Sequence, residues 1–270
     1  MSARLCLIGD PVTHSLSPQL HNAMLRALEI EGAYEVCRVR EGELAVFFDA
    51  ARAGAYCGFN VTMPHKKAAF DLADALTDAA RRVGAVNTVR IEKGRTIGHN
   101  TDGAGFLHAI KPHTVNAKDK IAAVLGAGGA ARSVALALAD AGWQVRVVNR
   151  TPSHAQALAE LAPNICAVEL AEALCDCALF VNATPLGMEG EKADFEDLAF
   201  LRALPKSALV CDLVYRPAET ALLRAAREQG LDTMNGFPML CHQAVDALAF
   251  FLGKPLDHDR MMAVLKDVIT

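Results

Sequence analysis

The sequence has little excess of either charge and no long apolar run. Its 27 Lys and Arg residues nearly balance 31 Asp and Glu residues, which gives a formal net charge of −4. Binding to nucleic acid needs a basic surface, so that class of function is not expected. Charges interrupt every apolar run, so a membrane-spanning helix is not expected either. The first apolar run is too short for a secretory signal and predicts a strand, which favours a cytoplasmic protein.

Cysteine and histidine patterns of the kind that bind metals are also missing. The chain has eight cysteines, but it has no C-x-x-C, and Cys175-Asp-Cys177 is not a usual zinc spacing. We therefore expect reduced core cysteines and no metal site. Internal repeats, low-complexity segments and Pro/Ser-rich linkers are absent as well. Domain junctions must then be inferred from the order of the elements.

Strand and helix patterns alternate along most of the 270 residues, which are enough for two domains. This alternation predicts an α/β fold with mostly parallel sheets. Strands are expected near Leu5–Ile8, Tyr34–Val39, Gly58–Thr62, Val86–Ile91, Thr96–His99, Ile121–Leu125, Trp143–Val148, Leu179–Asn182 and Leu209–Leu213. Helices are expected at Pro18–Ile30, Leu44–Ala53, Lys66–Leu76, Gly103–Lys111, Met239–Leu252 and Asp259–Val268. Lys93-Gly94 predicts a hairpin turn.

A glycine-rich turn follows the strand expected at Ile121–Leu125. Gly126, Gly128 and Ala131 give G-x-G-x-x-A, and a helical pattern comes next. In the dinucleotide fingerprint the first glycine permits the tight turn and the second lets the backbone approach a pyrophosphate. The helix N-terminus favours the phosphates. The turn predicts a dinucleotide site, although a plain strand–helix connection has the same form.

The end of the next strand indicates which dinucleotide binds. NAD-binding units usually place Asp or Glu there to hold the ribose 2′-hydroxyl. Here Asn149 and Arg150 stand at that point. A guanidinium can pair with a 2′-phosphate, and no acid repels that group. The sequence therefore favours NADP, with a solvated loop cation as the alternative role for Arg150.

The position of this turn sets the expected domains. The fingerprint starts near residue 120, so the preceding block must form a separate unit, and a helical tail after such a unit often packs back on the first domain. We expect a substrate-binding domain over residues 1–101 and 237–270. A Rossmann-type NADP-binding domain is expected over residues 102–236.

Ser15 and Ser17 begin a cluster of polar residues outside the nucleotide turn. Ser17 followed by Pro18 suits the start of a helix, with Ser17 as the N-cap. Two hydroxyls at a helix N-terminus also suit a carboxylate ligand. Both interpretations of Ser17 stay open.

Thr62, Lys66 and Asp102 lie where strands are expected to give way to helices, the usual ligand-binding edge of an open α/β sheet. A cation in a first helical turn opposes the helix dipole, so Lys66 calls for another role than a surface lysine. Asp102 could cap its helix, or pair with Lys66. Such a couple would transfer the proton of an alcohol or carbonyl oxygen while NADP carries the hydride. Reversible oxidation of an alcohol is the chemistry expected.

Together these motifs resemble the shikimate dehydrogenase family over nearly the whole chain. The matching segments are Ser15-Leu-Ser17-Pro18 with His21-Asn22, Asn60-Val-Thr62-Met-Pro64-His-Lys66, Gly84-Ala-Val-Asn87-Thr88, Asn100-Thr-Asp102-Gly103, Gly126-Ala-Gly128-Gly129-Ala-Ala131, Asn149-Arg-Thr151, Asn182-Ala-Thr-Pro-Leu-Gly187-Met188, Asp212-Leu-Val-Tyr215-Arg-Pro217 and Met239-Leu-Cys-His-Gln243-Ala244. The resemblance implies NADPH-dependent reduction of 3-dehydroshikimate to shikimate, in the pathway to aromatic amino acids.

The resemblance also implies roles for residues. Lys66 and Asp102 are similar to the family's catalytic couple. The implied substrate ligands are Ser15, Ser17, Thr62, Asn87, Tyr215 and Gln243. The implied cofactor ligands are Gly126, Ala127, Gly128, Gly129, Ala130, Ala131, Asn149, Arg150, Thr151, Thr184, Leu213 and Gly236. A small-molecule substrate and a monomer or homodimer are expected.

Three positions depart from the family pattern. His154 stands where a second arginine often follows, so NADP preference could be weaker or depend on pH. Pro238 replaces a glycine beside the expected nicotinamide loop, and Leu252 replaces a tryptophan near the tail. A quinate/shikimate or aminoshikimate dehydrogenase with relaxed NAD/NADP use is therefore an alternative, although Ser17 in place of threonine favours shikimate. A non-catalytic ligand-sensing homologue is less favoured, because Lys66 and Asp102 are intact.

Overall fold

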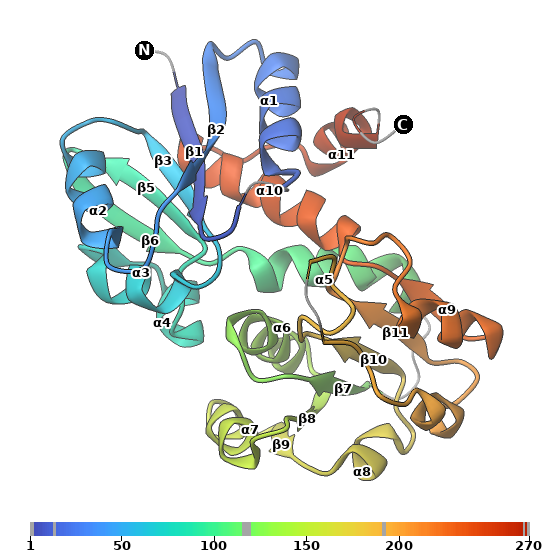
Figure 1. Ribbon diagram of the computed structural model, residues 1–270. Coiled ribbons are helices and arrows are strands. Elements are labelled where there is room, and N and C mark those ends of the chain that lie inside the picture. Colours follow the sequence, from blue (N-terminus) through green and yellow to red (C-terminus); the bar gives the residue numbers. More distant parts are fainter. Residues whose placement is uncertain (1–2, 13–14, 115–119, 191–192, 267, 269–270) are drawn as a thin grey trace. The chain divides into compact units, whose positions relative to one another are not determined.

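The computed structural model describes residues 3–12, 15–114, 120–190, 193–266 and 268. The chain divides into two compact units (Figure 1). The first unit contains residues 1–105 and 240–270, and the second contains residues 106–239. Each unit is built on its own six-stranded sheet, and the α/β fold predicted from the alternating patterns is confirmed. No described helix has the length and apolar character needed to cross a membrane.

The sheet of the first unit is mixed rather than wholly parallel. Its strands are β1 (Ala3–Gly9), β2 (Gly32–Arg38), β3 (Gly58–Val61), β4 (Ala75–Leu76), β5 (Thr88–Glu92) and β6 (Arg95–His99). They lie in the order β2-β1-β3-β5-β6-β4, and β5 runs antiparallel to both β3 and β6. Lys93 and Gly94 have φ of 52° and 72°, as a tight two-residue hairpin requires, so the predicted turn is confirmed.

Helices surround this first sheet. They are α1 (Ser17–Ala27), α2 (Leu44–Arg52), α3 (Lys66–Leu72), α4 (Asp78–Val83), the start of α5 (Asp102–Thr114), most of α10 (Phe237–Leu252) and α11 (His258–Lys266). Phe48 of α2 packs edge-on against Phe59 of β3, and both side chains are completely buried. Aromatic pairs of this kind anchor the helix layer to the sheet.

The helix predicted at Lys66–Leu76 is wrong at its C-terminal end. α3 ends at Leu72, Ala73 is extended, and Ala75–Leu76 forms β4 beside β6. Asp74 explains the change, because its carboxylate accepts hydrogen bonds from the Thr96 backbone N–H and hydroxyl at 2.8 Å each. A short polar side chain that bonds the neighbouring strand competes with the helix at that point.

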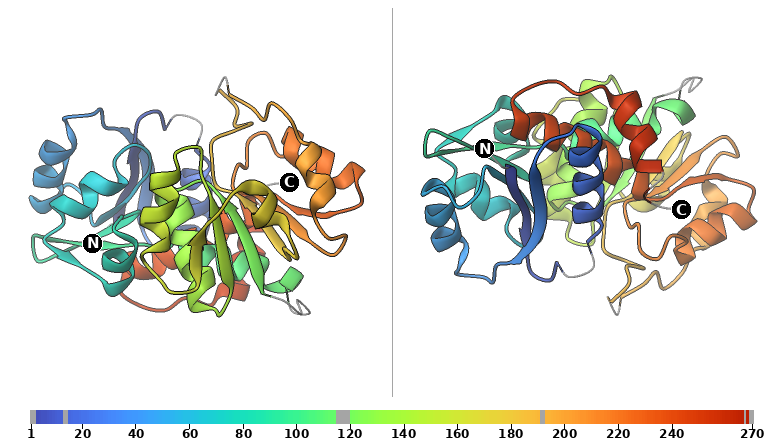
Figure 2. Two further views of the ribbon diagram at one scale, coloured as in Figure 1. Left: turned by 90° about the horizontal axis from the view of Figure 1, so that it is seen from below. Right: turned by 90° about the horizontal axis from the view of Figure 1, so that it is seen from above.

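The sheet of the second unit is entirely parallel. Its strands are β7 (Ile121–Leu125), β8 (Gln144–Val148), β9 (Ile165–Ala167), β10 (Leu179–Asn182), β11 (Leu209–Asp212) and β12 (Asp232–Met234). They lie in the order β12-β11-β10-β7-β8-β9. The helices α6 (Gly129–Asp140), α7 (Pro152–Ala159), α8 (Leu170–Leu174) and α9 (Ala221–Glu228) pack along it, and a 3-10 helix spans Ala199–Ala203 (Figure 2).

The strand order places β7 at a topological switch point of the second unit. β7 pairs with β8 on one side and with β10 on the other. The chain therefore adds β8 and β9 on one side of β7, and then crosses to add β10, β11 and β12 on the other side. Open α/β sheets bind ligands at the carboxyl ends of the strands beside such a point. The glycine turn at Gly126 follows β7 directly and therefore occupies this position.

Candidate active site

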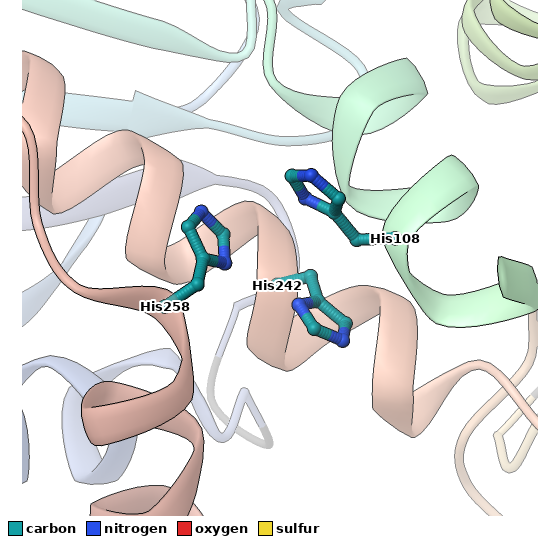
Figure 3. Close-up of side chains that lie close together, drawn as sticks. All are labelled: His108, His242 and His258. Carbon is teal, nitrogen blue, oxygen red and sulfur yellow. The ribbon is translucent and has the colours of Figure 1, made fainter. Parts of the chain in front are cut away.

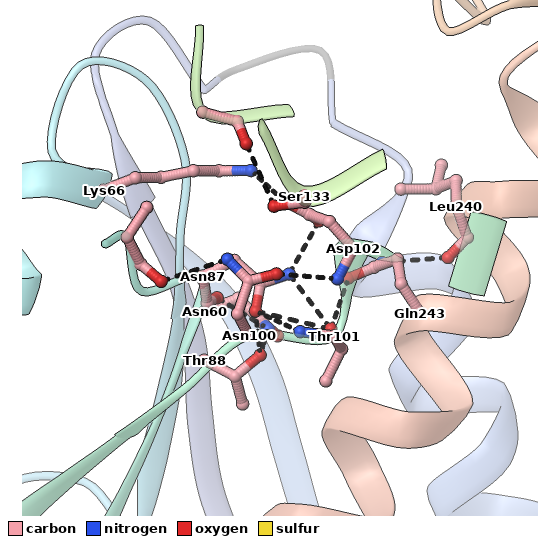
Figure 4. Close-up of polar contacts among 12 residues, drawn as sticks. Asn60, Lys66, Asn87, Thr88, Asn100, Thr101, Asp102, Ser133, Leu240 and Gln243 are labelled. Atoms are coloured by element: carbon pink, nitrogen blue, oxygen red, sulfur yellow. Dashed lines mark hydrogen bonds and ion pairs between the residues drawn. The ribbon is translucent and has the colours of Figure 1, made fainter. Parts of the chain in front are cut away.

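Lys66 and Asp102 form an ion pair within the first unit (Figure 4). Lys66 Nζ lies 2.6 Å from Asp102 Oδ2, and the two side chains are 20% and 8% exposed. Lys66 is the first residue of α3 and Asp102 is the first residue of α5. The preceding strands β3 and β6 run in the same direction with antiparallel β5 between them. The two side chains therefore meet at the common carboxyl edge of two strands that are not neighbours.

The second oxygen of Asp102 is also bound. Asn87 Nδ2 donates a hydrogen bond of 2.7 Å to Asp102 Oδ1, and the Asp102 backbone N–H donates to Asn100 Oδ1. The carboxylate thus bonds an ammonium and an amide, neither of which belongs to its own helix. This arrangement favours the ion-pair interpretation of Asp102 over the capping one.

The neighbouring Lys67 shows what a surface lysine does in the same helix. Its side chain is 69% exposed and pairs with Asp71 one turn later. Lys66 differs in both burial and partner. Its position in the first turn of α3, unfavourable for a cation by the helix dipole, is balanced by the Asp102 carboxylate.

The serine pair starts α1, but not in the way that the capping pattern predicted. Leu16 occupies the N-cap position with a helical backbone and no side-chain cap bond, and Ser17 is the first helical residue. The N-cap expectation for Ser17 is therefore wrong. Instead, Ser15 Oγ lies 3.2 Å from Ser17 Oγ and accepts the Ser17 backbone N–H. Ser17 is 6% exposed.

Thr62 and Gln243 lie on two further elements of the first unit. Thr62 is half-buried directly after β3, and Gln243 is half-buried on α10. The Thr101 hydroxyl lies 3.4 Å from Gln243 Oε1. Gly105 permits this approach, because a Cβ there would lie only 2.7 Å from the Gln243 backbone nitrogen. Tyr215, the remaining predicted substrate ligand, is half-buried after β11 and belongs to the second unit.

The glycine turn of the second unit fits a dinucleotide. Gly126 has φ of +114°, and a Cβ there would lie 3.1 Å from the Ala183 carbonyl oxygen. Gly128 is the N-cap of α6, has no side-chain cap bond, and its Cβ position is open. Ala127 lies between these two glycines, and Gly129, Ala130 and buried Ala131 form the first turn of α6. Free space and N–H groups at a helix start suit a pyrophosphate.

The predicted 2′-phosphate segment follows β8, the neighbour of β7. Asn149 Nδ2 donates to the Thr151 carbonyl at 3.0 Å, which closes a small turn around Arg150. Arg150, Thr151 and His154 are exposed. An exposed guanidinium on such a turn, here that of Arg150, suits the binding of an anionic group.

The remaining predicted cofactor residues follow β10, β11 and β12. Thr184 donates its hydroxyl to Asn182 Oδ1 at 2.6 Å. Gly236 packs on Leu213 so closely that any Cβ would overlap the Leu213 carbonyl. Pro238 lies in the first turn of α10, where a missing N–H breaks no helical hydrogen bond. All predicted cofactor residues thus lie along one edge of the second sheet.

Asp212 is a buried residue that the sequence analysis gave no role. It is 1% exposed at the end of β11 and accepts hydrogen bonds from Asn182 Nδ2, Thr220 Oγ1 and the Val214 N–H at 2.7–3.0 Å. Burial raises its pKa to about 6, although these three donors oppose the shift. Its signal in the sequence was an acid that ends an apolar strand.

Two histidines of the first unit lie close together although they are far apart in sequence. The rings of His242 on α10 and His258 on α11 are 5.7 Å apart (Figure 3). His258 Nε2 lies 2.8 Å from Asp246 Oδ1. The spacing of these residues in the sequence gave no sign of this pair. The expectation that the chain has no metal site stays a prediction.

Comparison with known proteins agrees with these motifs. Residues 7–89 match the model of the shikimate dehydrogenase substrate binding domain, and residues 109–184 match that of shikimate / quinate 5-dehydrogenase. A shikimate dehydrogenase (NADP(+)) from Acidiphilium cryptum is 46% identical over 254 residues, covering 93% of this chain and 91% of the relative. A second from Rubrobacter xylanophilus is 44% identical over 270 residues, covering 96% and 94%.

Solved structures show the same relationship. Shikimate 5-dehydrogenase from Thermus thermophilus, in complex with NADP(H) and shikimate, is 39% identical with a TM-score of 0.88, covering 99% of this chain and 100% of that chain. Quinate dehydrogenase from Corynebacterium glutamicum, in complex with NAD, is 35% identical with a TM-score of 0.87, covering 98% and 99%. This chain therefore belongs to the shikimate dehydrogenase family.

Proposed function

We propose that the chain catalyses the reversible NADPH-dependent reduction of 3-dehydroshikimate to shikimate. The observation that carries the proposal is the 2.6 Å contact between Lys66 Nζ and Asp102 Oδ2 at the carboxyl edge of the first sheet. The relatives named shikimate dehydrogenase (NADP(+)) support the substrate and the cofactor. A place in aromatic amino acid biosynthesis follows from this reaction.

Lys66 and Asp102 handle the proton in this proposal. The cofactor, when bound, supplies the hydride. Lys66 Nζ donates a proton to the ketone oxygen during reduction and takes it back during oxidation. Asp102 holds the ammonium group in place through Oδ2, while Asn87 fixes the other carboxylate oxygen. A positioned acid–base group of this kind contributes about 10²- to 10⁴-fold to a rate.

Six residues are proposed as substrate ligands. The Ser15 and Ser17 hydroxyls bind the carboxylate, since they lie 3.2 Å apart at the N-terminus of α1. Thr62, Asn87 and Gln243 bind ring hydroxyls, and Tyr215 is the remaining proposed substrate ligand. The residues along the carboxyl edge of the second sheet, from Gly126 to Gly236, bind NADP, with Arg150 on the 2′-phosphate.

The proposal also covers the roles of the two domains, the oligomeric state and the cellular location. We assign residues 1–101 and 237–270 to substrate binding and residues 102–236 to cofactor binding. A monomer or homodimer in the cytoplasm is the expected form. Size-exclusion chromatography with light scattering checks the first expectation, and fractionation of the source cells checks the second.

Steady-state turnover with each of four substrate–cofactor pairs tests the function. Shikimate or quinate is combined with NADP or NAD, and the nicotinamide absorbance is followed over a broad pH range. The highest kcat/KM is expected for shikimate with NADP. Absence of turnover with all four pairs would overturn the proposal, whereas a preference for quinate with NAD would assign the chain to the activity named for the Corynebacterium glutamicum relative.

A further inference from the structure

A row of buried polar side chains lies next to Asp102 in the first unit, and Figure 4 labels its members Asn87, Thr88 and Asn60. Its members are Asn87, Thr88, Asn60 and Tyr34, which are 3%, 0%, 5% and 2% exposed. Burying polar groups costs free energy unless each finds a partner. All four are hydrogen-bonded one to the next, so the row forms a continuous chain of contacts that ends on Asp102.

The hydrogen bonds of this row all run in one direction. Tyr34 donates its hydroxyl to Asn60 Oδ1 at 2.8 Å, which leaves the Asn60 NH₂ facing inward. That NH₂ donates to Thr88 Oγ1 at 3.0 Å and to the Asn87 carbonyl at 3.1 Å. An amide NH₂ can only donate, so Thr88 Oγ1 must accept here. The single hydroxyl proton of Thr88 is then left for Asn87 Oδ1, 2.8 Å away.

Thr88 and the Thr101 backbone N–H together fix which way the Asn87 amide faces. Asn87 Oδ1 accepts from the Thr88 hydroxyl and from the Thr101 N–H at 3.0 Å. Asn87 Nδ2 is directed at Asp102 Oδ1, 2.7 Å away. With the amide reversed, its oxygen would face the carboxylate, which only accepts while it is ionised. Asn87 Nδ2 thus binds Asp102 Oδ1, and Asp102 Oδ2 is bound by Lys66 Nζ.

We propose that Thr88 is a positioning residue for the reaction, acting through Asn87 on Asp102. Asn60 and Tyr34 set the direction of the Thr88 hydroxyl, and none of the three carries a role in the proposed substrate site. The proposal rests on the function proposed above. Its physical content is that the Thr88 hydroxyl proton, beside the Thr101 N–H, holds the orientation of an amide. That amide both holds the catalytic carboxylate and is expected to contact substrate.

Thr88 could instead only fill space in the sheet, and two substitutions separate these roles. Thr88→Val keeps the shape and removes the hydroxyl, whereas Thr88→Ser keeps the hydroxyl and removes a methyl group. A packing role makes serine the worse replacement, because it leaves a small cavity. A positioning role makes valine the worse replacement. Thr88→Ala, which differs from serine by the hydroxyl alone, serves if the valine variant fails to fold.

The experiment measures kcat and KM for shikimate against pH in the wild type and in these variants. Thr88→Val is expected to lower kcat about 10- to 100-fold, the range for losing the Asn87–Asp102 hydrogen bond, whose acceptor is charged. The loss in kcat should exceed the rise in KM, and the acid side of the kcat profile should move to higher pH. Thr88→Ser should stay within about threefold of the wild type, on the same grounds.

A second readout does not depend on turnover. The Asn87 side-chain amide gives ¹H–¹⁵N signals, assigned with Asn87→Asp, and its protons should exchange with solvent faster in Thr88→Val than in the wild type or Thr88→Ser. A wild type without turnover would overturn the proposed function and leave the amide exchange to decide this inference. Equal effects of serine and valine, or unchanged amide exchange in Thr88→Val, would overturn the role of Thr88.

Discussion

Asp102 in the first unit and Asp212 in the second are both buried aspartates at the edge of a sheet, and they have different partners. Asp102 bonds the Lys66 ammonium on one oxygen and an amide on the other. Asp212 bonds an amide, a hydroxyl and a backbone N–H, all neutral. Burial raises the pKa of Asp212 to about 6. A carboxylate beside a cation can take part in proton transfer. A carboxylate among neutral donors instead has a structural role, because its hydrogen bonds hold the surrounding loops together.

The comparison implies that the two units can be damaged separately. A change at Lys66 should remove chemistry and leave the second unit intact. A change at Asp212 should loosen the second unit first. Trp143 is the only tryptophan and is 4% exposed just before β8, so its fluorescence reports unfolding of the second unit.

The largest effect is expected for Lys66→Ala. Loss of the proton-transferring group should lower kcat about 10²- to 10⁴-fold while KM for shikimate changes much less. Lys67→Ala is the matched control, because Lys67 is exposed in the same helical turn and should leave turnover nearly unchanged. A rise in KM with kcat nearly kept would show that Lys66 only positions substrate.

Asp212→Ala should destabilise the second unit. Three buried donors lose their acceptor, so the free energy of unfolding should fall by about 3 kcal/mol or more. Denaturant unfolding followed by Trp143 fluorescence measures the change. Asp232→Ala, an exposed aspartate on the neighbouring strand β12, is the control and should shift stability by under about 0.5 kcal/mol. Equal changes in the free energy of unfolding for the two variants would show that Asp212 has no structural role.

The raised pKa of Asp212 gives a pH dependence with a definite sign. Asp212 has a pKa of about 6 in the folded chain, whereas the ordinary pKa of an aspartate, as in the unfolded chain, is 3.8. The contribution to stability is therefore fully present below about pH 4 and is lost as pH rises through 6, by on the order of 1–3 kcal/mol. Trp143 unfolding at several pH values should show this slope in the wild type relative to Asp212→Asn. Parallel curves would contradict it.

Arg150→Ala should give a smaller and more selective effect. Loss of a charge-assisted contact with the 2′-phosphate is expected to lower kcat/KM about 10-fold or more with NADP and very little with NAD. Arg202→Ala, an exposed arginine on the 3-10 helix before β11, controls for net charge. Equal losses with both cofactors would contradict the assignment of Arg150.

Local patterns predicted most strands and helices, because alternation and helical spacing reflect which face is buried. The Lys93–Gly94 hairpin was predictable for the same local reason. The end of α3 was not, because it depends on Asp74 meeting Thr96, 22 residues away in sequence. The N-cap expectation for Ser17 failed because Leu16 and not Ser17 precedes the first helical turn.

The candidate site was predictable in its residue types more than in its connections. The polar segments of the motifs identified Lys66, Asp102 and Asn87 as candidates. Nothing local showed that Thr88 directs the Asn87 amide, since that depends on Asn60 and Tyr34 from two other strands. Asp212 was similarly hidden, because an acid that ends a strand looks like an ordinary loop residue until its buried donors are seen.

Gly105 has a consequence for the order in which the chain folds. Its missing side chain admits α10, whose Gln243 and Phe250 contact Thr101 and Arg90 across separations of 142 and 160 residues. The second unit is contiguous, so all of its residues have been synthesised before α10 is complete. The first unit waits for α10, and long loop closure makes that step slow.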